Sequence, residues 1–122
     1  GFVKNEIIPL YQMAGDILLM PYEKSITGSS GGNTVDFCSP MKMFEYLASG
    51  RPIISSDIPV FHEVLNSKNA VFCDSEDTVC WRDAILQIQN QPLIATSLST
   101  QAKLDSQEYS WINRCKNGLV DF

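Results

Sequence analysis

One carboxylate, that of Glu45, stands in a stretch that otherwise reads as a buried helix. Residues 39–49 read S-P-M-K-M-F-E-Y-L-A-S, and their apolar side chains would cover nearly the whole circumference of a helix. A carboxylate on such a helix is costly unless it is paired or hydrogen-bonded. The spacing leaves two interpretations open. Either Glu45 contacts Lys42, three residues earlier, or the backbone, or it accepts hydrogen bonds from the hydroxyls of a ligand.

The start of the same helix is a second candidate for chemistry. Ser39 is a favoured N-cap and Pro40 is favoured at the first helical position. The free N–H groups and the dipole at a helix N-terminus favour an anion, most often phosphate. Because Pro40 has no N–H, the donors would be the N–H groups of Ser39, Met41 and Lys42 together with the Ser39 hydroxyl. An ordinary capped helix without a ligand is the alternative.

Other residues that could carry chemistry give weaker signals. The stretch 28–33 reads G-S-S-G-G-N and lacks the residue order of the known nucleotide-binding loops, so we predict a flexible loop or lid. His62 lies near a helix start with no Ser or Cys motif around it, and we predict a surface residue. Trp81 and Trp111 fall at helical spacing with apolar residues and are expected in the core.

The four cysteines do not form a recognisable metal or redox motif. None of them falls in a C-x-x-C pair, and a single His cannot complete a zinc site of the usual spacing. We therefore expect no metal, and four reduced, mostly buried thiols in a cytoplasmic protein. The cysteines are Cys38, Cys73, Cys80 and Cys115.

The elements that must position these residues alternate between strands and helices. We expect helices at 5–14 (capped by Asn5 and ended by Gly15), 39–49 (closed by Gly50), 59–65, from a cap at Ser75 or Asp77 to the break at Pro92, 93–106 and 110–119, and buried strands at 16–20, 52–55 and 70–73, with a long loop at 21–38. This alternation predicts an α/β fold with a parallel sheet covered on both faces. Ligands of such sheets bind beyond the carboxyl ends of the strands, which places the chemistry around residues 21–45.

Length and composition limit the classes of function. The chain has 122 residues, of which 44% are hydrophobic and 19% are charged, as in an ordinary single globular domain. The net charge of −5 argues against nucleic acid as a partner, because no basic stripe is available. No apolar run approaches the ~20 residues of a membrane span, and the chain does not open with a secretory leader pattern.

Residues 39–65 carry a long and specific resemblance. They read S-P-M-K-M-F-E-Y-L-A-S-G-R-P-I-I-S-S-D-I-P-V-F-H-E-V-L. This resembles the nucleotide-sugar-binding segment of group 1 (family 4) glycosyltransferases, whose pattern is S-P-x-K-x-F-E-Y-[LM]-A-x-G-x-P-I-I-x-S-D-x-P followed by an E-V-L helix. The G-F-V start, the strand A-G-D-I-L-L-M-P-Y and the late Y-S-W at 109–111 agree as well, whereas 75–108 match only in general character.

The resemblance implies a fold and an activity. That family has the GT-B architecture, in which two Rossmann-like domains face each other across a cleft. The nucleotide-sugar donor binds mainly the C-terminal domain, and transfer to a glycan or lipid-linked acceptor usually retains the anomeric configuration without a metal or cofactor. Residues 1–122 look like the later part of that C-terminal domain, a Rossmann-like three-layer unit with a short parallel sheet. The parent would act in the cytoplasm or peripherally at the inner membrane face, in glycan or cell-surface polysaccharide synthesis.

The resemblance also assigns roles to individual residues. Glu45 matches the second glutamate of the family's glutamate–seven residues–glutamate motif, which holds the ribose hydroxyls of the nucleotide. Phe37 stands where the first glutamate would contact the donor sugar, and the neighbouring Asp36 is the candidate replacement. No catalytic residue is expected within the chain itself. The segment that would supply backbone donors to the diphosphate comprises Cys38, Ser39, Pro40, Met41 and Lys42.

The resemblance leaves the first half of the domain unaccounted for. In the usual strand order 3-2-1-4-5-6, the chain would hold strands 4, 5 and 6. Strand 16–20 would then have an unpaired edge. We therefore expect the chain to form a homodimer through this edge or to need the absent portion of the domain. The absent portion carries the Arg and Lys that stabilise the leaving diphosphate in the family. A non-catalytic α/β nucleotide-binding or interaction module, including a degenerate relative, is the alternative function.

Overall fold

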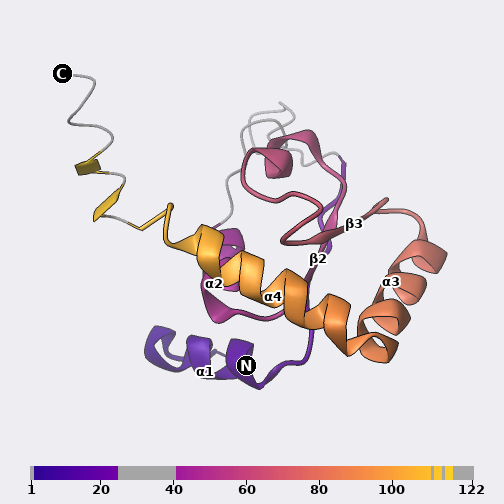
Figure 1. Ribbon diagram of the computed structural model, residues 1–122, viewed down its shortest axis with the longest axis horizontal. Coiled ribbons are helices and arrows are strands. Elements are labelled where there is room, and N and C mark those ends of the chain that lie inside the picture. Colours follow the sequence, from indigo (N-terminus) through magenta and orange to yellow (C-terminus); the bar gives the residue numbers. More distant parts are fainter. Residues whose placement is uncertain (1, 25–40, 111, 114, 117–122) are drawn as a thin grey trace.

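The computed structural model describes residues 2–24, 41–110, 112–113 and 115–116 (Figure 1). In chain order the elements are η1 (Asn5–Ile7), α1 (Ile8–Ala14), β1 (Leu18–Met20), α2 (Met41–Ser49), β2 (Ile53–Ser56), η3 (Pro59–Glu63), β3 (Val71–Cys73), α3 (Thr78–Asn90) and α4 (Pro92–Ser106), where η denotes a 3-10 helix. Residues 112–113 and 115–116 are also helical, within the range 110–119 where a last helix is predicted. The predicted alternation of strands and helices is therefore confirmed across the described residues.

The sheet is parallel and has the strand order β1-β2-β3. Leu19 of β1 pairs with Ile54 of β2, which pairs with Val71 of β3. Because each strand returns to the same end through a helical crossover, all three carboxyl ends meet at one edge. That edge is where the predicted loop 21–38 begins.

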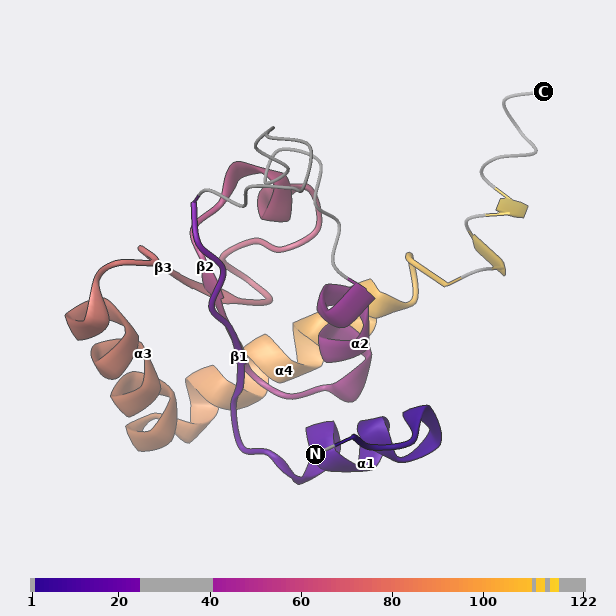
Figure 2. The same ribbon diagram turned by 180° about the vertical axis from the view of Figure 1, so that it is seen from behind.

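Helices cover both faces of the sheet, which gives three layers (Figures 1 and 2). Successive side chains of a strand point to opposite faces, so neighbouring residues of β2 enter two different cores. Ile53 packs with α2, η3 and the end of α4, in a cluster of buried residues that comprises Met20, Met43, Leu47, Ile53, Ile58, Phe61, Leu65, Ala70 and Ala102. Ile54 packs with α3 and the start of α4, in a second cluster that comprises Ile54, Cys73, Ala84, Ile88 and Leu98.

Helix α4 joins the two cores. Leu98 in its first half belongs to the α3 cluster, and Ala102, one turn later, belongs to the α2 cluster. Near its end, the Asp105 carboxylate accepts a 2.8 Å hydrogen bond from Nδ2 of Asn69, which is fully buried. The helix therefore crosses from one layer to the other and is tied to the segment that leads into β3 (Figure 1).

Three of the predicted helix ends can be compared with the structure. Asp77 caps α3, since its side chain accepts hydrogen bonds from the N–H groups of Val79 and Cys80. Gly50 ends α2 with a φ of 65°, a left-handed conformation that favours glycine. The predicted cap at Asn5 is wrong: Asn5 lies inside η1, and no side-chain cap precedes that element or α1.

The prediction that strand 16–20 is buried on both faces is also wrong. β1 begins only at Leu18, and Leu19 remains 40% exposed between the buried Leu18 and Met20. The reason is that α3 lies over β2 and β3, leaving part of the same face uncovered beside β1. A depression of about 630 Å³ opens there, lined by Asp16, Ile17, Ile85, Ile88, Gln89, Pro92, Ala95 and Thr96.

Among the residues that the structure describes, no helix combines the length and the apolar composition that crossing a membrane needs.

Candidate functional site

Glu45 is exposed, which corrects the prediction that α2 is buried nearly all round. α2 buries only Met43 and Leu47, and Met41 is 65% exposed. Phe44 and Tyr46 are half-buried at the border of the packed face. α2 therefore buries one face, against the sheet and α4, and packs less closely on α1. The Glu45 carboxylate bears no burial cost and is available to a ligand.

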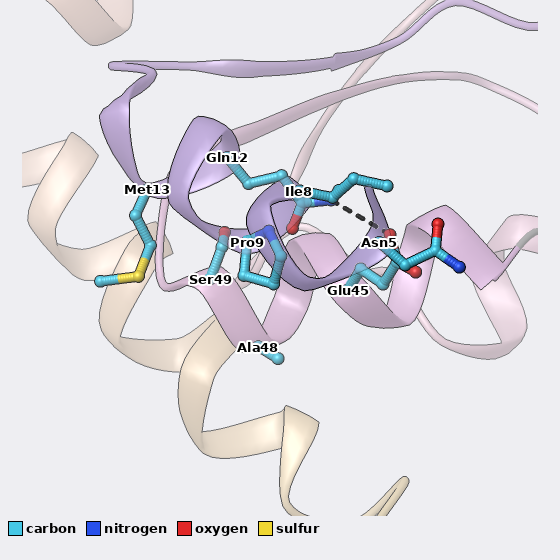
Figure 3. Close-up of a pocket in the computed structure, with 8 residues that line it drawn as sticks. All are labelled: Asn5, Ile8, Pro9, Gln12, Met13, Glu45, Ala48 and Ser49. Carbon is cyan, nitrogen blue, oxygen red and sulfur yellow. Dashed lines mark hydrogen bonds between the residues drawn. The ribbon is translucent and has the colours of Figure 1, made fainter. Parts of the chain in front are cut away.

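A pocket of about 370 Å³ lies between α1 and α2, with Glu45 in its wall (Figure 3). Ile8, Pro9, Met13 and Ala48 supply much of its apolar lining, and the polar groups come from Asn5, Gln12, Glu45 and Ser49. Glu45 thus lies where an apolar surface and a few polar groups converge, as in sites for small molecules.

The partner of Glu45 comes from another helix. Its Oε2 accepts a 3.1 Å hydrogen bond from Nε2 of Gln12 in α1 (Figure 3). Lys42, the partner considered from the sequence, makes no ion pair with it among the described residues. Sequence reasoning missed Gln12 because the two residues are 33 positions apart and meet only through the packing of α1 on α2.

The arrangement around Glu45 suits a ligand that carries hydroxyl groups. An ionised carboxylate only accepts hydrogen bonds, and its two oxygens can take up to about four of them. Gln12 supplies one donor and restrains the side chain, while the exposed carboxylate keeps accepting capacity. The Asn5 and Gln12 amides add both donors and acceptors to the same pocket.

The predicted anion site at the start of α2 falls only partly within the structure. Met41 and Lys42 open the helix and are exposed. The other residues predicted to bind the diphosphate or the donor sugar lie outside the described residues, namely Asp36, Phe37, Cys38, Ser39 and Pro40. Their roles stay predictions.

The carboxyl edge of the sheet carries an ion pair that the sequence did not reveal. After β1, Nζ of Lys24 lies 2.6 Å from Oδ2 of Asp74, which follows β3. The Lys24 ammonium, together with the Glu76 N–H, lowers the pKa of the Asp74 carboxyl, and Asp74 raises the pKa of Lys24. Nearby, the backbone N–H of Tyr22 donates a 2.8 Å hydrogen bond to Oγ of Ser56, which is fully buried. The segment after β1 is therefore tied to the neighbouring strand β2 and to the residue that follows β3.

His62 lies at the same edge and is a surface residue, as predicted. Its Nε2 lies 2.7 Å from Oδ1 of Asp57, and its ring stacks on Phe72 with the centroids 4.1 Å apart. The partner Asp57 follows β2 directly, at a carboxyl end that the topology marks for ligands. Trp81, which was expected in the core, is half-buried, and its Nε1 donates a 2.9 Å hydrogen bond to the Asp74 carbonyl.

Within the described residues, no group of three or more His, Cys, Asp or Glu side chains is placed to hold a metal ion. Cys73 is buried, Cys80 is half-buried and Cys115 is exposed, and all three are free thiols. The expectation of mostly buried thiols is therefore wrong for Cys115, and Cys38 lies outside the described residues.

Two known proteins are similar to this chain, one in sequence and one in fold. The chain is 46% identical over 48 residues to an O-antigen chain mannosyltransferase of Salmonella typhimurium, a match that covers 39% of this chain and 13% of that protein. Its structure resembles that of a sucrose-phosphate synthase of Thermosynechococcus elongatus with a TM-score of 0.76 at 19% identity, over 98% of this chain and 28% of that one. The chain thus spans much less than the length of either protein.

The structural match shows the fold that the resemblance implies, a Rossmann-like unit of the GT-B type with a short parallel sheet. The family model for the glycosyl transferases of group 1 matches residues 1–91, which include the sheet, both helices that line the Glu45 pocket and all of α3. The chain therefore belongs to the group 1 glycosyltransferase family.

Proposed function

We propose that this chain forms the nucleotide-sugar-binding part of a glycosyltransferase, with Glu45 holding the ribose hydroxyls of the donor. The observation that carries the proposal is the exposed Glu45 carboxylate, restrained by Gln12 in the wall of a pocket of about 370 Å³. Two vicinal hydroxyls match the two oxygens of a carboxylate, and hydrogen bonds to a charged acceptor are the stronger kind. Membership of the family supports the same reading.

The diphosphate of the donor would bind at the start of α2. Free N–H groups and the helix dipole favour an anion at such a terminus. The segment proposed for this contact runs from Cys38 through Ser39, Pro40 and Met41 to Lys42. Lys42 is exposed at the helix start and adds a positive charge. The donor sugar would then lie toward Asp36 and Phe37, with Asp36 in the role that the family gives to a glutamate.

The acceptor and the pathway follow from the family and from one relative. A relative that matches part of the chain is named as an O-antigen chain mannosyltransferase, which favours a role in polysaccharide synthesis and makes a mannose donor the first to test. We propose transfer with retention to a glycan or lipid-linked acceptor, without a metal, in the cytoplasm or at the inner membrane face.

We propose further that this unit works within a longer protein. The chain matches only 28% of the solved chain that it resembles and 13% of the mannosyltransferase. A second domain would supply the acceptor site. Basic groups elsewhere in the donor domain would stabilise the charge that develops on the leaving diphosphate, where electrostatic stabilisation acts. No catalytic residue is assigned within residues 1–122.

The first test is a calorimetric titration of the chain with UDP, GDP and ADP. We expect one of the three to bind, and Glu45→Gln to weaken that binding about 10- to 100-fold, because hydrogen bonds to a charged group contribute roughly 1.5–3 kcal/mol. Glu108→Gln is the matched control, since Glu108 is an exposed glutamate outside the pocket, and it should leave the affinity unchanged.

The outcomes separate the proposal from its alternative. Equal affinities of the native chain and Glu45→Gln would refute the role of Glu45. If neither the chain nor a longer protein that contains it binds any of the three nucleotides, the result would instead favour a degenerate, non-catalytic relative. Phe37, which stands where the family has a glutamate, suggests that alternative.

A further inference from the structure

A polar bridge joins α1 to α2 in the wall of the Glu45 pocket. Nε2 of the half-buried Gln12 donates a 3.1 Å hydrogen bond to Oε2 of Glu45, although the two residues are 33 positions apart in the chain (Figure 3). An ionised carboxylate only accepts hydrogen bonds, so the Gln12 amide must turn its NH2 group toward Glu45. The bond also has a charged acceptor, which makes it one of the stronger kind.

A second polar contact holds the backbone that carries Gln12. α1 buries none of its own residues, so apolar packing alone does not attach it firmly to the domain. The Arg51 guanidinium, two residues after the end of α2, donates a hydrogen bond to the carbonyl of Met13. Met13 follows Gln12 directly, so this contact fixes the place from which the Gln12 amide reaches Glu45.

An exposed glutamate gains from such a partner when it binds a ligand. Binding costs free energy for each flexible side chain that it immobilises, and a contact present before the ligand arrives removes part of that cost. The Gln12 bond occupies one accepting position on Oε2. Because a carboxylate can accept up to about four hydrogen bonds, both oxygens keep the capacity to accept from neighbouring hydroxyls.

We propose that Gln12 is a positioning residue of the ribose site. It holds the Glu45 carboxylate ready for two vicinal hydroxyls, and the site therefore prefers ribonucleotides over nucleotides that lack those hydroxyls. This inference rests on the function proposed for Glu45. The competing explanation is that the Gln12 bond only attaches α1 to α2, in which case it would support the binding of both kinds of nucleotide equally.

The test titrates UDP, GDP and ADP, each beside its 2′,3′-dideoxy form, by calorimetry. Gln12→Met removes the donor and keeps the length of the side chain. We expect it to weaken binding of the ribonucleotide about 2- to 10-fold, as for the loss of one preorganised side chain, and to leave the affinity for the dideoxy form unchanged. Gln87→Met, at an exposed position of α3 outside the pocket, is the matched control and should change neither affinity.

A double-mutant cycle connects the effect to the carboxylate. In the Glu45→Ala background, adding Gln12→Met should weaken ribonucleotide binding by less than about twofold, because the group that Gln12 orients is already gone. Additive effects of the two substitutions would show that Gln12 does not act through Glu45.

A measurement without nucleotide tests the restraint itself. NMR scalar couplings of the Glu45 side chain report its distribution among rotamers. We expect one dominant rotamer in the native chain and averaged couplings in Gln12→Met. Averaged couplings in the native chain would overturn the inference, and this result needs neither a bound nucleotide nor a folded variant.

The outcomes separate this inference from the function proposed for Glu45. Equal ribonucleotide affinities of the native chain and Glu45→Ala would remove the ribose site and, with it, the role of Gln12. A loss of affinity in Glu45→Ala, combined with no effect of Gln12→Met or with equal weakening of both kinds of nucleotide, would overturn only the positioning role.

Discussion

At the scale of single residues, Asn69 is a buried polar side chain with three hydrogen-bond partners. Its Nδ2 donates to the Val64 carbonyl and to Asp105, and its Oδ1 accepts from the Asn66 N–H. Asn69→Ala would leave groups in a buried site unpaired, so we expect a loss of about 2–4 kcal/mol in the free energy of unfolding. Urea unfolding measures it.

The control for that prediction is Asn90→Ala, at the exposed end of α3. It removes the same side chain where water already satisfies the amide, and it should change stability by less than about 0.5 kcal/mol. Equal effects of the two variants would show that the bonds to Asn69 do not matter for stability.

The Lys24–Asp74 pair makes a prediction about pH. The folded-state pKa of Asp74 lies below its ordinary value. The ion pair therefore stabilises the fold at a pH above that ordinary pKa, and this stabilisation is lost as the pH falls through the lowered pKa. The raised pKa of Lys24 means that the contribution is lost again as pH rises through it, above 10.5. In Lys24→Met, the Asp74 pKa measured by NMR should rise toward its ordinary value. An unchanged Asp74 pKa would show that the ion pair does not form in solution.

The sequence identified Glu45 but not its surroundings. Its position in the family motif pointed to a ligand, whereas the apolar spacing wrongly placed it on a buried helix. Spacing counts Met41 and Ala48 as core residues, but only tertiary packing decides which face of a helix is covered, and both are exposed. Gln12 was missed because helix packing brings it to Glu45, and the pairing of Asp57 with His62 was missed because loop geometry sets it.

At the scale of elements, the cap of α3 was predictable because its signal is local. Asp77 accepts from two N–H groups of the first turn, and Asp77→Ala should lower stability by about 1 kcal/mol. Asp83→Ala, in the middle of the same helix and exposed, is the control and should cost clearly less. Thermal unfolding of both variants checks this, and a neutral Asp77→Ala would contradict the capping geometry.

The strands show which structural features a sequence pattern can predict and which it cannot. β2 and β3 lie within one residue of the predicted ranges, because short apolar runs flanked by polar residues mark buried strands well. Asp16 and Ile17 were included in the predicted strand because the pattern cannot separate strand residues from the residues that lead into the strand. The prediction that Leu19 is buried was wrong for a different reason, namely that α3 covers β2 and β3 but not β1.

At the scale of the whole molecule, β1 is an edge strand within the described residues, as its place in the family's strand order predicts. An uncovered strand edge tends to pair with another chain. If the expected homodimer forms through this edge, Leu19→Lys should weaken self-association at least about tenfold, because a lysine on an edge opposes pairing. Sedimentation equilibrium measures this.

The control for the edge is Leu104→Lys, which places the same charge on an exposed position of α4. It should leave the association constant unchanged. A native chain that stays monomeric at high concentration, with one cooperative unfolding transition, would remove the homodimer from the account.

The order and direction of the strands were predictable because few topologies satisfy right-handed crossovers between parallel strands. The crossing of α4 between the two cores was not, since a helix that contacts two layers has no distinctive spacing. Leu98 and Ala102 are both apolar and lie one helical turn apart, so the sequence pattern does not show that they join different clusters.

The most direct test of the central claim, that Glu45 marks a nucleotide site, is an NMR titration of the isotope-labelled chain with the nucleoside diphosphate that binds it. The account predicts that the largest amide shifts fall on α1 and α2, around Asn5, Gln12 and Glu45, and that Glu45→Gln needs an about 10- to 100-fold higher nucleotide concentration to reach the same shifts. Saturable shifts confined to another part of the chain, such as the depression beside β1, or shifts that persist unchanged in Glu45→Gln, would contradict it.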